Sequence, residues 1–178
     1  MKNNIKCELL SEQKIKEAVE KMGAQITSDY KGKELVLICI LKGSIIFTAD
    51  LMRAIDLPLK IDFLAASSYG SGTQSSGTIT IKKDIDTDIK GKHVLLVEDI
   101  IDSGNTLSRL KKMFSEREAA SVKICTMLDK PARRETEISP DYCGYTVPDE
   151  FVVGCGLDFD EYYRNLPYIG ILKPEAYE

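Results

Sequence analysis

Three mostly apolar runs of strand length limit most strongly what this chain can fold into. They occupy residues 34–41, 93–97 and 122–128, and stretches with helical spacing of apolar residues stand at about 11–30, 44–55 and 104–117. Strands that are apolar on both faces and alternate with helices are typical of a parallel sheet covered on both sides. The sequence therefore predicts an α/β fold, in which a central, mostly parallel, twisted sheet is flanked by helices.

The remaining segments predict how this sheet is completed. Residues 59–67 indicate a further strand and residues 78–83 a hairpin arm, with a long loop rich in Gly and Ser over 68–78 between them. The last forty residues contain four prolines and favour short strands and irregular structure. We expect a single domain over residues 1–178, with a small irregular hood built from the N- and C-terminal segments.

Composition excludes several classes of partner. The formal net charge of −4 and the pI near 5.2 remove the broad attraction to phosphate backbones, so we expect no nucleic-acid partner. Five cysteines, an odd number without a Cys-x-x-Cys pair, indicate a reducing compartment. No stretch approaches the roughly 18 apolar residues of a membrane span, and the N-terminus lacks the apolar part of a signal peptide. We therefore expect a cytoplasmic protein with no membrane contact.

The most informative segment follows the apolar run at 93–97. Glu98 and Asp99 come directly after this run, at the carboxyl end of a predicted parallel strand, where ligands of open sheets bind. Residues 102–106 (Asp-Ser-Gly-Asn-Thr) can then form a turn at a helix N-terminus, whose amides and hydroxyls favour a phosphate. Carboxylates accept hydrogen bonds from hydroxyls, so the matching ligand carries a phosphate beside vicinal hydroxyls, as ribose 5-phosphate does.

Two plainer interpretations compete with this one. Acids and glycine after a strand are common as helix caps, so the turn at 102–106 can be purely structural. An acidic strand end also occurs in P-loop NTPases, but these need a G-x-x-x-x-G-K-[ST] loop. The nearest approach, at residues 72–78, lacks the lysine.

The whole segment at 93–106 resembles the phosphoribosyl diphosphate motif of the type I phosphoribosyltransferases. The shared pattern is an apolar strand, Glu-Asp, two apolar residues and Asp-Ser-Gly-x-Thr. Residues 40–44 (ILKGS), 67–73 (SSYGSGT), 128–134 (LDKPARR) and 147–177 are similar, in the same order, to segments of hypoxanthine-guanine phosphoribosyltransferases. The resemblance runs from about residue 35 to the end, and implies transfer of a phosphoribosyl group from phosphoribosyl diphosphate to a 6-oxopurine base.

The resemblance also implies roles on the sugar-phosphate side. Glu98 and Asp99 would hold the ribose hydroxyls, and Asp102 would exchange a proton with purine N7 as the general acid/base. The peptide before the lysine of the pyrophosphate loop is often cis in this family. The remaining contacts would come from Ser103, Gly104, Asn105 and Thr106 for the phosphate, and from Leu41, Lys42, Gly43 and Arg164 for the pyrophosphate.

A further group would serve the base, the metal and the lid. Lys130 would donate to purine O6, which would exclude adenine, and Phe151 would stack on the ring. The Val152 backbone and Asp158 would border the base. Mg²⁺ is the implied cofactor, with Asp158, Glu98 and Asp99 as ligands. Ser68 and Tyr69 would begin a closing lid, and the enzyme would form a homodimer or a homotetramer.

Taken singly, several of these residues have plainer explanations. Lys130 alone indicates an exposed cation, Phe151 with Val152 ordinary strand core, and Asp158 with Arg164 a surface pair. An alternative function also remains, since RNA-binding regulators of pyrimidine operons share the fold and its phosphoribosyl diphosphate motif. Those relatives typically lack an acid at the place of Asp102, and the acidic pI disfavours RNA.

Overall fold

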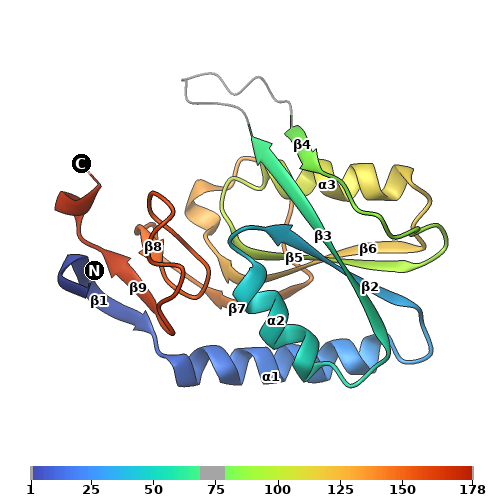
Figure 1. Ribbon diagram of the computed structural model, residues 1–178, viewed down its shortest axis with the longest axis horizontal. Coiled ribbons are helices and arrows are strands. Elements are labelled where there is room, and N and C mark those ends of the chain that lie inside the picture. Colours follow the sequence, from blue (N-terminus) through green and yellow to red (C-terminus); the bar gives the residue numbers. More distant parts are fainter. Residues whose placement is uncertain (1, 69–78, 178) are drawn as a thin grey trace.

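The computed structural model describes residues 2–68 and 79–177, and a six-stranded sheet forms its centre (Figure 1). The strand order is β4-β3-β2-β5-β6-β7. Every neighbouring pair is parallel except β3 and β4, which form the predicted antiparallel hairpin. The predicted α/β sheet is thus confirmed. Its strands are β2 (Leu35–Leu41), β3 (Leu59–Ser68), β4 (Ile79–Lys83), β5 (His93–Ile101), β6 (Ser121–Asp129) and β7 (Tyr142–Thr146).

Helices cover both faces of this sheet, as the apolar strands predict. Helices α1 (Glu12–Asp29) and α2 (Ile45–Ala54) pack on one face, and α3 (Asn105–Glu116) packs on the other. Alternate residues of β2 serve the two cores: Leu35 and Leu37 belong to the first, whereas Val36 and Ile38 belong to the second. Burial on both faces explains why β2 lacks the polar alternation of a half-exposed strand.

A small second sheet joins the two ends of the chain. It has the order β1-β9-β8, with antiparallel pairing throughout, and lies beside the carboxyl ends of the central strands in Figure 1. Its strands are β1 (Ile5–Leu10), β8 (Val152–Val153) and β9 (Ile169–Leu172). Three short 3₁₀ turns complete the described chain: Lys2–Asn4, Pro131–Arg133 and Pro174–Ala176.

The sequence-based boundaries agree closely with the structure, with one correction. Helix α1 begins where expected, because the Ser11 hydroxyl accepts a hydrogen bond from the Lys14 amide at 3.3 Å. Glu98 and Asp99, however, lie within β5 and not after its end. The reason is that β6 stays paired with β5 as far as Ile101, whereas β2 leaves β5 after Val97. The acids therefore sit on a strand that has lost one neighbour.

Two further sequence predictions concern chemistry and membranes. All five cysteines are free thiols, and Cys39 and Cys125 are fully buried within the apolar runs that contain them. Over residues 2–68 and 79–177, the structure has no helix with both the length and the apolarity needed to span a membrane.

Candidate active site

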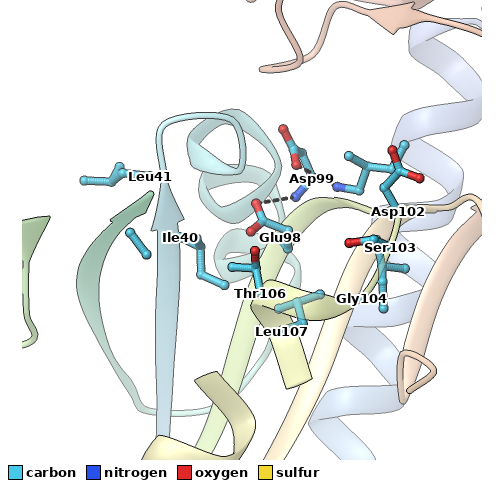
Figure 2. Close-up of a pocket in the computed structure, with 12 residues that line it drawn as sticks. Ile40, Leu41, Glu98, Asp99, Asp102, Ser103, Gly104, Thr106 and Leu107 are labelled. Carbon is cyan, nitrogen blue, oxygen red and sulfur yellow. Dashed lines mark hydrogen bonds between the residues drawn. The ribbon is translucent and has the colours of Figure 1, made fainter. Parts of the chain in front are cut away.

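A cavity of about 250 Å³ opens where β2 and β5 separate (Figure 2). Apolar walls come from Ile40, Ala66 and Leu107. Polar groups of β5 and of the following turn line the rest, and Figure 2 shows Glu98, Asp99, Asp102, Ser103 and Thr106 gathered there. The structure thus gathers the central part of the predicted sugar-phosphate set around one hollow, namely Leu41, Glu98, Asp99, Asp102, Ser103, Gly104 and Thr106.

The two adjacent acids of β5 form a tightly coupled pair. Burial raises the pKa of the Glu98 carboxyl well above its usual range, and the neighbouring Asp99 charge adds to this rise. Burial also raises the pKa of Asp99. Backbone amides hold both groups, since the Asp99 amide donates to Glu98 Oε1 at 3.2 Å and the Ile100 amide donates to Asp99 Oδ1 at 2.7 Å. Burial thus disfavours the ionised form of both carboxyl groups, and a bound cation or hydroxyl donors would favour it.

The turn after β5 presents its backbone to the cavity. Gly104 adopts a left-handed conformation, with φ of +82°, and stands immediately before α3 without a side-chain cap. The Ser103 hydroxyl accepts a hydrogen bond from the Asn105 amide at 3.3 Å, and the Gly104 carbonyl accepts from Ser108 at 2.9 Å to begin the helix. An uncapped helix N-terminus next to hydroxyl groups is suited to an anion.

Asp102 occupies the junction between the strand and this turn. Its Oδ1 atom is buried, yet it has no hydrogen-bond partner among the described atoms. An unpartnered buried carboxylate oxygen is costly, and a water, an ion or a ligand can supply the missing donor. Asp102 is thus placed to accept a proton or a hydrogen bond from a molecule in the cavity.

Three segments meet at Gly43, in the loop after β2. A side chain there would clash with Asp99, because a Cβ atom built on Gly43 lies 1.8 Å from Asp99 Oδ2. From the other side comes Gly156, with φ of +99°, whose Cβ would lie 1.9 Å from the Gly43 carbonyl oxygen. The peptide between Leu41 and Lys42 is cis. Both glycines are needed for this close approach.

Charged side chains pair with one another around the loop of Gly43. Lys42 Nζ contacts Glu161 Oε2 at 2.8 Å, and Arg164 Nη2 contacts Asp158 Oδ1 at 2.8 Å. Arg164 Nη1 also donates to the Gly156 carbonyl at 2.8 Å. The structure therefore pairs Asp158 with Arg164, as the plainer interpretation suggested, and does so beside the loop of Lys42.

The candidate base-binding residues form a separate group that reaches toward the turn. Lys130 is 5% exposed, so the expectation of an exposed cation for this residue in isolation is wrong. Its Nζ donates to the Glu150 carbonyl at 2.9 Å, and burial lowers its pKa while the Asp102 charge acts in the opposite direction. Phe151 is half-buried and stacks on Tyr177, with ring centroids 4.9 Å apart. Val152 lies in β8 and is buried.

The acids present fit Mg²⁺ as a substrate-borne cation. Within residues 2–68 and 79–177, no three Asp, Glu, His or Cys side chains gather as a ready-made metal cage. Mg²⁺ commonly uses only one or two protein carboxylates and completes its shell with waters and phosphate oxygens. The coupled pair of Glu98 and Asp99, whose ionised form is disfavoured by burial, supplies that kind of partial site.

Sequence reasoning missed several residues that shape this site. Gly156 lies within the similar segment 147–177, but only the fold brings it against Gly43. Glu161 and Arg134, the partners of Lys42 and of the Asp102 carbonyl, are likewise revealed by contacts and not by spacing. The lid prediction cannot be followed, since Tyr69 and the Ser68 side chain lie outside the described part of the structure.

Comparisons with known proteins agree with this geometry. A family model described as a phosphoribosyl transferase domain matches residues 7–160. The hypoxanthine-guanine phosphoribosyltransferase of Streptococcus pneumoniae is 59% identical over 177 residues, which cover 99% of this chain and 98% of the relative. The enzyme of the same name from Bacillus subtilis is 51% identical over 178 residues, covering 100% and 99%.

Solved structures give the same result for the fold. A hypoxanthine phosphoribosyltransferase from Staphylococcus aureus superposes with a TM-score of 0.97, covers 100% of this chain and 97% of its own, and is 49% identical. The expected fold of the type I phosphoribosyltransferases is therefore confirmed. The match to the Staphylococcus aureus structure includes the turn at 102–106 and the segment that carries Phe151. The chain accordingly belongs to the phosphoribosyltransferase family, and within it to the hypoxanthine-guanine phosphoribosyltransferases.

Proposed function

We propose that this enzyme transfers the phosphoribosyl group of 5-phospho-α-D-ribose 1-diphosphate to hypoxanthine and guanine, and so salvages purines. The products are IMP or GMP and pyrophosphate. One observation carries the proposal: the cavity beside β5 combines an acid pair, an unpartnered Asp102 oxygen and an uncapped helix N-terminus. These groups match ribose hydroxyls, a reacting purine and a phosphate, respectively.

The chemistry at the sugar follows from where charge develops. As the bond from the anomeric carbon to pyrophosphate breaks, and the bond to purine N9 forms, the ribose becomes positive. Glu98 and Asp99 bind its hydroxyls, and their negative charge stabilises the sugar most in the transition state. Asp102 accepts the N7 proton of the base, and its buried Oδ1 is the atom with capacity to do so.

The pyrophosphate side is served by backbone and cations. The amides of the loop at 41–43 and the guanidinium of Arg164 bind the departing pyrophosphate. Mg²⁺, when bound, neutralises the charge that accumulates on this leaving group. Glu98, Asp99 and Asp158 are the residues that would hold Mg²⁺. The 2.8 Å contact between Asp158 and Arg164 supports a metal ligand next to a pyrophosphate contact.

Base selection rests on the second group of residues. Lys130 donates to purine O6, Phe151 stacks on the ring, and the Val152 backbone meets the pyrimidine edge. The buried position of Lys130 and its contact with the Glu150 carbonyl support this role, because a fixed donor rejects an amino group in place of O6. Adenine is therefore not a substrate.

Incubation with phosphoribosyl diphosphate, Mg²⁺ and each purine tests the proposal, with nucleotide formation as the readout. Hypoxanthine and guanine should react and adenine should not. Asp102→Asn should lose turnover by a factor on the order of 100 or more, and still bind phosphoribosyl diphosphate. Full activity of this variant would remove Asp102 from the mechanism, and failure of the wild-type protein with both 6-oxopurines would overturn the function.

Assembly, domain structure and location are part of the same proposal. Residues 1–178 act as one domain, with the small sheet as its hood. A homodimer or homotetramer is supported by Ile45 and Ile46 on α2, which are 44% and 42% exposed, and sedimentation measurements test it. The free thiols fit a cytoplasmic enzyme. The relatives above are named as transferases, and they give no support to the RNA-binding alternative.

A further inference from the structure

Arg134 makes three contacts that tie separate parts of the site together. Its Nε donates to the Asp102 carbonyl at 2.9 Å, its Nη1 donates to the Ile138 carbonyl, and its Nη2 pairs with Asp129 Oδ1. The side chains of Arg134 and Asp129 are only 15% and 19% exposed. A planar guanidinium has the fixed fork of donors that such a three-way contact requires.

These contacts connect the two halves of the candidate site. Asp102 belongs to the turn that faces the sugar phosphate, whereas Asp129 ends β6 and precedes Lys130, the predicted base contact. Loss of the guanidinium would leave the Asp129 carboxylate and two carbonyl oxygens without this partner. Such groups cost free energy when they stay largely buried, so the turn and the strand end would shift to find water or new donors.

The residues after Arg134 support the turn from behind. The Glu135 amide donates to the Ser103 carbonyl at 2.9 Å, and the Asn105 side chain donates to Glu135 Oε2 at 2.5 Å. A Cβ atom built on Gly104 would lie 2.5 Å from Thr136 Oγ1 and 3.0 Å from Arg134 Cδ. The turn is therefore packed directly against residues 134–138.

This support determines which way the turn amides point. The carbonyl groups of Asp102 and Ser103 are both bonded to the 134–138 segment. In a trans peptide the C=O and N–H groups point in opposite directions. The amides of Ser103 and Gly104 are consequently directed away from that segment, and both residues line the cavity.

We infer that Arg134 is a positioning residue. It orients the Ser103 and Gly104 amides toward the ribose phosphate and holds Asp102 at a fixed position relative to Lys130. Arg134 would touch neither substrate. The inference rests on the proposed function, because it assigns the turn to the phosphate of phosphoribosyl diphosphate. A single guanidinium group behind the site then sets the geometry of the sugar-phosphate half of the site.

The test compares Arg134→Gln and Arg134→Lys with a matched control, Arg133→Gln. Arg133 is the preceding residue, and its exposed ion pair with Asp149, at 2.5 Å, contributes little to stability. Steady-state kinetics with hypoxanthine give kcat and a separate KM for each substrate. Because a misplacement of about 1 Å can cost on the order of 100-fold, Arg134→Gln should lower kcat/KM for phosphoribosyl diphosphate by that order.

Two further readouts separate positioning from general destabilisation. The KM for phosphoribosyl diphosphate should rise more than the KM for hypoxanthine, and Arg134→Lys should recover part of the loss because it keeps one charged donor. An equal rise in both KM values, or kinetics of Arg134→Gln equal to those of Arg133→Gln, overturns the inference. If Arg134→Gln does not fold, Arg134→Lys is judged by the same split. Wild-type inactivity with hypoxanthine would instead refute the function itself.

Discussion

Gly43→Ala is the substitution whose effect follows most directly from the geometry. The added Cβ atom would lie 1.8 Å from Asp99 Oδ2, whereas ordinary contacts begin at 3.4 Å, so the carboxyl group must retreat by about 1.6 Å. Asp99 cannot swing freely, because its Oδ1 accepts the Ile100 amide at 2.7 Å. Overpacking of this kind costs about 1–3 kcal/mol of stability. The displaced acid would also leave the place proposed for its contact with the ribose, which should lower kcat/KM on the order of 100-fold.

Gly91→Ala provides the control for this experiment. Gly91 has a left-handed conformation, with φ of +71°, which Gly43 does not share, but a Cβ atom on Gly91 meets nothing within 4 Å. Nucleotide formation from hypoxanthine gives kcat/KM, and urea unfolding followed by circular dichroism gives stability, since the chain has no tryptophan. Gly43→Ala should lose both, and Gly91→Ala only some stability. Equal kcat/KM values for the two variants would refute the claim that Gly43 makes room for Asp99.

Three other variants test separate parts of the structure. Burial raises the pKa of Glu98, so the contribution of this carboxyl group to folding is present below its usual pKa of 4.5 and is lost as the pH rises through the folded value. In metal-free buffer, Glu98→Gln should therefore lose less stability than the wild type between acidic and alkaline pH. An equal loss of stability in the two proteins would contradict this. Phe114 is fully buried under the sheet, so Phe114→Ala should lower the free energy of unfolding in urea by about 3–5 kcal/mol. Tyr162→Ala should lower it little, because Tyr162 is 66% exposed. Tyr177→Ala removes the ring stacked on Phe151 and should raise KM for hypoxanthine but not for phosphoribosyl diphosphate; an equal rise in both would assign Tyr177 to stability alone.

The fold was predictable because its signals are local. The continuous apolar run of β2 reflects burial on both faces, and Ser11 caps α1 by contacting a residue only three positions away. The β5 boundary was less accessible. Its end depends on which neighbour continues the pairing, and that neighbour, β6, lies some twenty residues further along the chain.

The site was predictable where its residues are consecutive, and obscure where distant segments meet. Glu98, Asp99 and the turn at 102–106 share one strand and one helix start, so their spacing already places them together. Lys130 carries no local sign of burial, because the carbonyl that it contacts belongs to Glu150. Arg134 likewise acquires its meaning only from Asp102, across 32 positions of the chain.

The two opposed glycines explain how the small sheet approaches the loop after β2. Gly156 stands between β8 and β9, and its missing side chain lets this connection touch the Gly43 carbonyl, while Gly43 in turn admits Asp99. Arg164 fixes the same connection by donating to the Gly156 carbonyl. A side chain at either glycine would separate the acid pair of β5 from the connection between β8 and β9, which carries Asp158 and Arg164. Two missing methyl groups thus keep the Asp99 carboxyl group, the loop after β2 and the connection between β8 and β9 in direct contact.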